Sequence, residues 1–176
     1  MTDASRSLSR ETLGSALRPL RRSLPMALLR AREAVMDRFR RMLRQNGLTE
    51  QQWRVIRVLA EHDALEVSQL ARHSFLLPPS LSRILKFLSR KGLVLRRTVD
   101  TDQRRFEVRL TAAGRRMFQR VAPSSESIYR DIEQVFGHAR LEQLYALLSD
   151  LEHAMTARSL SDSGDRSETR GTSKTV

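Results

Sequence analysis

The stretch Leu77–Leu110, LPPSLSRILKFLSRKGLVLRRTVDTDQRRFEVRL, decides the fold of this chain. Pro78 and Pro79 suit the first turn of a helix, because proline donates no backbone N–H and fixes φ near the helical value. On a helical wheel, the residues that follow separate into an apolar face and a face of hydroxyl and basic side chains. The apolar face holds Leu81, Ile84, Leu85, Phe87 and Leu88, and the polar face holds Ser82, Arg83, Lys86, Ser89 and Arg90. We therefore expect a short helix with one buried face.

A basic β-hairpin is predicted after this helix. Gly92 supplies the left-handed backbone that ends the helix. Residues 94–99 form the expected first strand, 100–104 a polar tip, and 105–110 a second strand that alternates apolar and charged side chains. Residues 80–110 hold nine basic and three acidic side chains, so this segment carries half of the chain's net charge of +12.

Composition limits the function classes. The 176 residues include 32 Lys or Arg against 20 Asp or Glu, with a pI near 11.4, which favours a polyanionic partner, nucleic acid ahead of an anionic membrane surface. The absence of cysteine excludes disulfides, thiol catalysis and thiol-based redox sensing. No apolar run approaches the roughly 18 to 20 residues of a membrane span, and the N-terminus lacks a signal peptide's apolar centre. We expect a cytoplasmic protein.

Two helical segments precede the helix and basic hairpin described above. Apolar residues recur every three or four positions from Ser23 to about Gln45, with Ser23 as a possible cap, Pro25 just inside and a stop near Asn46-Gly47. The arginines of this helix are expected mostly to form a solvated face. Thr49–Gln52 fits a capping box that opens a second helix to about Glu61.

The next segments complete the expected DNA-binding domain at 48–111, which is called the reader below. A third helix is predicted from Glu66 to His73, joined by a link at 74–77 to the helix that begins at Pro78. Two short helices joined by a turn, the second with exposed cations, are typical of a helix-turn-helix. With the hairpin attached, the pattern predicts a winged helix.

Two long helices are expected after the hairpin. The first begins at Thr111, runs to about Phe136, and should kink or break near Val121-Ala122, because Pro123 lies inside it. The second spans Ala139–Arg158, with an apolar stripe at Leu141, Leu144, Leu148, Leu151 and Met155.

The predicted fold class is mainly α with a small β-hairpin wing: a winged helix-turn-helix with a helical dimerisation domain. Its expected parts are a flexible N-terminal arm at 1–20 with a short helix at 11–17, a dimerisation region at 21–47 and 112–157, a DNA-binding domain at 48–111 and a disordered tail at 158–176. The leucine stripes need a partner surface, so a twofold homodimer is expected. Such a dimer would place two readers one turn of DNA apart, on a palindromic operator.

Several motifs resemble the MarR family of winged-helix repressors. They are Thr49–Ile56 (TEQQWRVI), Gln69–Ala71 (QLA), Leu81–Leu88, Gly92–Val94, Asp102–Arg105 (DQRR) and Leu110–Gly114 (LTAAG). The resemblance covers roughly residues 24–156, and the run from Ser23 to Arg57 is similar to the branch of homoprotocatechuate-operon repressors. It implies a dimer that binds operator DNA, blocks transcription and is released by a small phenolic or aromatic acid.

The candidate DNA-binding residues are Ser80, Ser82, Arg83, Lys86, Arg90, Arg104 and Arg105. Arg83 is the first choice for base readout, since its fork can bind both acceptors of guanine. The resemblance implies a minor-groove role for the arginine after the aspartate of the wing, and Arg104 is preferred over Arg105. Asp102 is expected to pair with one of these arginines and to order the wing tip.

The effector is expected to be a small aromatic carboxylate, hydroxylated or heteroaromatic. Such a ligand needs an apolar slot with one fixed cation and a few polar partners. Helix placement and the resemblance suggest Ser23, Met26, Arg30, Arg32, Trp53 and Arg54 as lining residues. Two alternatives stay open: Trp53 can equally be plain core, and Arg32 can equally pair with an acidic residue on its own or another helix.

No cofactor, metal site or enzymatic activity is expected. The four histidines, His62, His73, His138 and His153, lie far apart along the chain without the i, i+4 spacing of a helical metal site. No phosphate loop, nucleophile elbow or recognisable carboxylate pair occurs. The alternatives are an architectural DNA-binding protein, for which the excess charge alone would suffice, and an enzyme or interaction bundle without a DNA partner.

Overall fold

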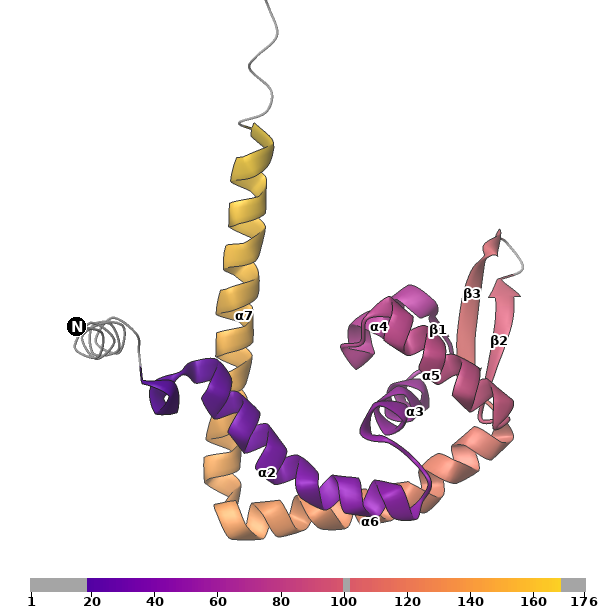
Figure 1. The fold of residues 1–176 in the computed structure, drawn as a ribbon, viewed down its shortest axis with the longest axis horizontal. Coiled ribbons are helices and arrows are strands. Elements are labelled where there is room, and N and C mark those ends of the chain that lie inside the picture. The colour runs from indigo at the N-terminus through magenta and orange to yellow at the C-terminus, as the bar shows by residue number, and fades with distance from the viewer. Residues whose placement is uncertain (1–18, 100–101, 169–176) are drawn as a thin grey trace, which may run out of the picture. The chain divides into compact units, whose positions relative to one another are not determined.

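The fold is that of a computed structural model, which describes residues 19–99 and 102–168, with side chains except those of 21, 98–105 and 159–168. The chain divides into two compact units, Met1–Ile128 and Tyr129–Val176. The helix predicted at 11–17 lies outside the described residues. Figure 1 shows the order of the elements, in which helices predominate and two strands form a hairpin.

The first helices begin and end close to the predicted residues. A short 3-10 turn η1 (Leu20–Arg22) leads into α2 (Leu24–Gln45), which ends before Gly47 at φ +66°. Ser23 occupies the N-cap position, but within the described residues its side chain makes no capping hydrogen bond, contrary to the predicted role. The capping box of α3 (Glu50–Glu61) is confirmed, because the Gln52 N–H donates to Thr49 Oγ1 (3.2 Å) and the Thr49 N–H to Gln52 Oε1 (2.9 Å).

The helix-turn-helix is confirmed in α4 (Val67–Ser74) and α5 (Pro78–Arg90). Phe75 ends α4 in the left-handed conformation (φ 50°, ψ 47°), which turns the chain toward α5. Leu81, Ile84, Leu85 and Leu88 of α5 are buried, as the wheel predicts, while Phe87 is only half-buried. Gly92 adopts φ +66° after α5, as expected of a helix stop.

The hairpin belongs to a sheet that has three strands among the described residues. The strands are β1 (Leu65–Glu66), β2 (Val94–Val99) and β3 (Asp102–Leu110), in the order β1-β3-β2 and antiparallel throughout. β1 was not predicted, and it pairs Leu65 with Val108. β3 begins three residues earlier than predicted. Phe106, predicted to share the inner face with Val108 and Leu110, is 42% exposed because it lies farther toward the tip than the buried core.

The two long helices differ from their predicted lengths. α6 (Ala112–Phe136) continues through Pro123, so of the predicted kink or break near Val121-Ala122 the break is wrong. α7 (His138–Glu168) extends ten residues beyond Arg158, so the structure also departs from the predicted disordered tail over 159–168. Gly137 separates the two helices at φ +94°. Among the described residues, none of the helices has both the length and the apolar character that a membrane crossing requires.

Apolar side chains remain exposed on helices of both units when each is considered by itself. On α2 of the first unit they include Leu24, Leu28 and Val35, which belong to the predicted stripe. On α7 of the second unit they include Leu144, Leu148 and Met155, again members of the predicted stripe. A helix face that contacts only water would carry mainly polar side chains, so contact with solvent does not account for these apolar faces.

Gly114 allows the start of α6 to approach the start of β2. The Thr111 N–H donates to Leu93 O (3.1 Å), and the Thr111 hydroxyl donates to Gly92 O (2.6 Å). A Cβ at position 114 would lie 2.1 Å from Leu93 O, a backbone atom that cannot move away without breaking this junction.

We therefore predict that Gly114→Ala lowers the free energy of unfolding by about 1–3 kcal/mol, the usual cost of overpacking. Urea denaturation followed by circular dichroism would measure the loss. Ser124→Ala, at an exposed position of the same helix, should change stability by less than about 0.5 kcal/mol. Equal stability of Gly114→Ala and the parent protein would contradict the close approach.

Candidate nucleic-acid interface and cation cluster

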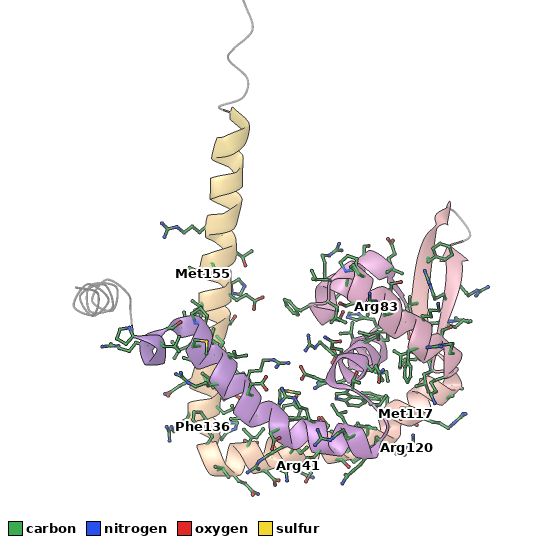
Figure 2. All side chains as sticks on the ribbon, viewed as in Figure 1. Arg41, Arg83, Met117, Arg120, Phe136 and Met155 are labelled. Atoms are coloured by element: carbon green, nitrogen blue, oxygen red, sulfur yellow. The ribbon has the colours of Figure 1, made fainter. Side chains whose placement is uncertain are left out.

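The outer face of α5 carries the predicted DNA-binding side chains. Ser82, Arg83, Lys86 and Arg90 are exposed, and Ser80 in the first turn is partly exposed. Their orientation follows from burial of the opposite face, because a helix that packs through Leu81, Ile84, Leu85 and Leu88 must turn its remaining face outward. Figure 2 labels Arg83 on this part of the first unit, well separated in the view from Arg41 on α2.

The wing supplies further cations. Arg104, Arg105 and Asp102 lie on β3 by their backbone, and the structure does not describe their side chains. Arg96 and Arg97 of β2 are exposed, and Arg97 lies opposite Glu107 in the register. The Arg96 guanidinium lies 5.1 Å from the centre of the Phe106 ring. Sequence reasoning missed Arg96, although the antiparallel register makes it a diagonal neighbour of Phe106.

Arg32 and Arg54, both predicted to line the effector site, meet at one carboxylate. Each contacts Glu50 Oε1, Arg32 through Nη2 and Arg54 through Nη2 at 2.9 Å. The second branch of Arg54 donates from Nη1 to the backbone carbonyl of Ser74 (3.1 Å). Glu50 therefore joins α2 to α3, and Arg54 joins Glu50 to the last residue of α4.

Arg40 and Glu33 extend this cluster along α2. Arg40 Nη2 lies 2.7 Å from Glu33 Oε2, its Nε lies 3.6 Å from Glu50 Oε2, and Arg32 Nη1 lies 2.8 Å from Glu33 Oε1. The hydrogen bond from Arg40, with the charges of Arg40 and Arg32, lowers the pKa of Glu33. We define the cation cluster as Arg32, Arg40 and Arg54 with Glu33 and Glu50. It has three cations and two anions, which leaves it one negative charge short of neutrality.

The other predicted effector residues do not belong to the cation cluster. Trp53 is 6% exposed and stacks on Phe118 of α6, with ring centres 5.6 Å apart and planes inclined by 19°. Ser23 and Met26 lie at the start of α2, and the rise of 1.5 Å per residue puts Ser23 about 13 Å along the helix from Arg32. Arg30, two residues before Arg32, points away from it around the helix. Of the predicted set, Arg32 and Arg54 are brought together, because both contact Glu50.

Two features of the structure were not predicted from the sequence. The alternative that Arg32 pairs with acidic residues is confirmed for both its own helix (Glu33) and another helix (Glu50), but the sequence did not single out Glu50, which lies eighteen positions away. The pairing of Glu50 with Arg54 had a readable i, i+4 signal. The rings of His62 and His73, expected to be apart, lie 5.1 Å from centre to centre. Among the described residues no group of three or more His, Asp or Glu side chains is placed to hold a metal ion.

The sequence profile of the MarR family matches residues 48–106. The homoprotocatechuate degradative operon repressor of Escherichia coli is 42% identical over 128 residues, which cover 73% of this chain and 86% of the relative. The crystal structure of transcriptional regulator PA4135 is 44% identical, with a TM-score of 0.72, and the match covers 77% of this chain and 98% of that one.

A structure of NadR in complex with 4-hydroxyphenylacetate is 38% identical, with a TM-score of 0.67 and coverage of 77% of this chain and 96% of that one. The sequence also suggested Bordetella bronchiseptica BpsR as an individual match within the same branch. BpsR is only 19% identical over 73% of this chain and 98% of its own, at a TM-score of 0.68, so that likeness shows the fold alone.

The pKa of Glu33 offers a test of the cation cluster. Arg40→Gln should raise this pKa toward its ordinary value of 4.5, because the largest stabilising contact of the carboxylate is lost. In the parent protein the lowered pKa of Glu33 makes its pairing stabilising at pH values above the pKa that Glu33 has in the unfolded chain. This contribution disappears as the pH falls through the pKa of Glu33 in the folded protein. An NMR titration of the glutamate side chains would measure both. Arg41→Gln, which removes an exposed partner of Asp37, should leave Glu33 unchanged.

Proposed function

The chain belongs to the MarR family of transcriptional regulators, and we propose that within it the protein is a homodimeric repressor of a palindromic operator, released by a small aromatic carboxylic acid. Its relatives are DNA-binding transcriptional repressors and not enzymes. The observation that carries the proposal is the division of α5 into a buried apolar face and an exposed face of hydroxyl and basic groups.

The DNA contact is proposed to use α5 in the major groove and the wing beside it. Ser80, Ser82, Arg83, Lys86 and Arg90 would reach base edges and phosphates, and Arg104 and Arg105 the minor groove, with Asp102 ordering the tip. Arg96 is added as a phosphate contact, because its stacking on Phe106 limits the side-chain entropy that binding would cost. The segment 78–90 has no acidic residue to oppose phosphate.

The dimer is proposed to form through the helices outside the reader. The exposed apolar residues of α2 and of α7 need a partner, and a second copy of the chain supplies matching surfaces under twofold symmetry. Two readers related by a twofold axis would bind half-sites of opposite orientation, which is why the operator should be a palindrome.

The effector is proposed to be an acid because the cation cluster lacks one negative charge. The NadR structure, 38% identical, holds 4-hydroxyphenylacetate, and the E. coli relative is named for a homoprotocatechuate operon. We place the carboxylate against Arg32 and Arg54, with Trp53, Ser23, Met26 and Arg30 around the ring. The stacking of Trp53 on Phe118 makes it a rigid wall for such a ring.

The proposal is tested by selecting binding sites from a random DNA library with the full chain and measuring the mass of the free protein. We expect a dimer at micromolar concentration, an enriched palindrome, and release of that DNA by one acid from a panel headed by 4-hydroxyphenylacetate. An architectural DNA-binding protein would instead enrich no sequence, although its binding would still weaken steeply with salt. A monomer without sequence preference would overturn the proposal.

Arg83→Ala should weaken binding of the selected DNA by about 1–3 kcal/mol and relax the base preference at one position in each half-site. Fluorescence anisotropy at fixed ionic strength would give both values. Arg41→Ala, which removes one cation from α2 far from α5 in Figure 2, should leave the base preference intact. Unchanged affinity of Arg83→Ala would reject its assignment to base readout.

Arg32→Ala should raise the acid concentration needed for release by at least about tenfold, since a charged hydrogen bond contributes about 1.5–3 kcal/mol. The amide analogue of the same acid should fail to release DNA from the parent protein. If Arg32→Ala and Arg54→Ala both respond at the parent's acid concentration, the two arginines do not hold the carboxylate.

A further inference from the structure

Arg54 connects the cation cluster to the turn that precedes α5. Its guanidinium donates Nη2 to Glu50 Oε1 (2.9 Å) and Nη1 to the carbonyl oxygen of Ser74 (3.1 Å). Ser74 is the last residue of α4 and is fully buried, and its hydroxyl donates to the Leu70 carbonyl one turn earlier. Only three residues, 75–77, lie between Ser74 and the first residue of α5.

From these contacts we propose that Arg54 is a positioning residue for α5, and that Glu50 is the link through which an acid bound at Arg32 changes operator binding. The second part rests on the function proposed above. Arg54 acts on DNA through the Ser74 carbonyl and not by touching a base, and this role is separate from its proposed contact with the acid.

The geometry suits a planar fork. A guanidinium can donate to a carboxylate and to a carbonyl at once in fixed directions, whereas a lysine ammonium is a point charge on a flexible stem. The Ser74 carbonyl is at the C-terminal end of α4, where the helix leaves unsatisfied carbonyls and a partial negative charge, so a cation there is stabilising. Arg54 therefore fixes the end of α4, and with it the start of α5.

Glu50 makes this contact sensitive to an acid. Its Oε1 is shared by Arg32 of α2 and Arg54 of α3, and both partners together with Arg40 compete for two carboxylate oxygens. An acid that binds Arg32 takes that partner from Glu50 and leaves the longer contact of Arg40 Nε with Glu50 Oε2 (3.6 Å). The joint between α2 and α3 is thereby weakened, so α2 can move relative to the turn before α5. If the intact joint is the state that fits the operator, operator DNA must weaken acid binding by the same factor.

The first experiment uses Arg54→Lys, which keeps the charge and loses the fork. We expect a three- to tenfold loss of affinity for the selected operator, measured in the absence of any acid. Amide hydrogen exchange should become faster at 74–77 and 80–81, on either side of the two prolines that lack an amide hydrogen, while the melting temperature stays within a few degrees. Parent-like exchange and operator affinity in the absence of acid would overturn the positioning role.

The second experiment uses Glu50→Gln, with Glu61→Gln as the matched control, since Glu61 is an exposed carboxylate on the same helix. By calorimetry, the dissociation constant of Glu50→Gln for the chosen acid should be lower than the parent's or within threefold of it. The acid should nevertheless lower the operator affinity of this variant by a factor whose logarithm is less than half of the parent's. Glu61→Gln should behave like the parent. Full release from Glu50→Gln, or loss of its acid binding, would overturn the link.

The two proposals fail in distinguishable ways. If the parent protein prefers no DNA sequence, or no acid of the panel releases it, the proposed function fails. The exchange measurement on Arg54→Lys still judges the positioning role, because it needs neither DNA nor acid. If the parent responds and both variants respond equally, only the inference about Glu50 and Arg54 fails.

Discussion

The structure depends on the burial of one face of α5. Leu81, Leu85 and Leu88 are almost completely removed from solvent, and each such side chain contributes about 1.5–3 kcal/mol through burial. A thirteen-residue helix is too short to be stable alone in water, so this packing both forms the helix and sets its rotation. The direction of Arg83 is therefore a consequence of where the leucines lie.

Local signals in the sequence predicted the elements that local interactions form. The capping box at Thr49 and the prolines at the start of α5 act within one helical turn, and the structure has them at the predicted residues. β1 escaped prediction because two residues carry no periodicity, and it exists only through pairing with β3. The predicted break at Pro123 was wrong because a helix can accommodate the loss of one N–H donor when its neighbouring turns continue.

The candidate site shows the same difference between features that local interactions determine and features that depend on tertiary packing. Exposure of Ser82, Arg83 and Lys86 followed from the wheel, which needs only the helical period. The sequence left open that Arg32 pairs with an acidic residue of another helix, but it did not identify Glu50 as that residue, because the contact depends on how α2 crosses α3. A sequence shows that arginines are abundant on α2, but only tertiary placement tells which of them have a carboxylate within reach.

The arginines of the cation cluster and the basic residues of α5 differ in what surrounds their charges. Arg32, Arg40 and Arg54 lie against carboxylates, so most of their field is cancelled nearby and their contribution is geometric: they hold α2, α3 and the end of α4 in register. The cations of α5 share their helix with no acidic residue, so their field extends into solvent, where phosphate can release its condensed counterions in exchange. On the function proposed above, a change in one ion pair would alter the position of α5 without altering the charge that attracts DNA. An acidic effector would then act on the paired arginines while the unopposed charge of the reader, and its nonspecific attraction to DNA, stays the same.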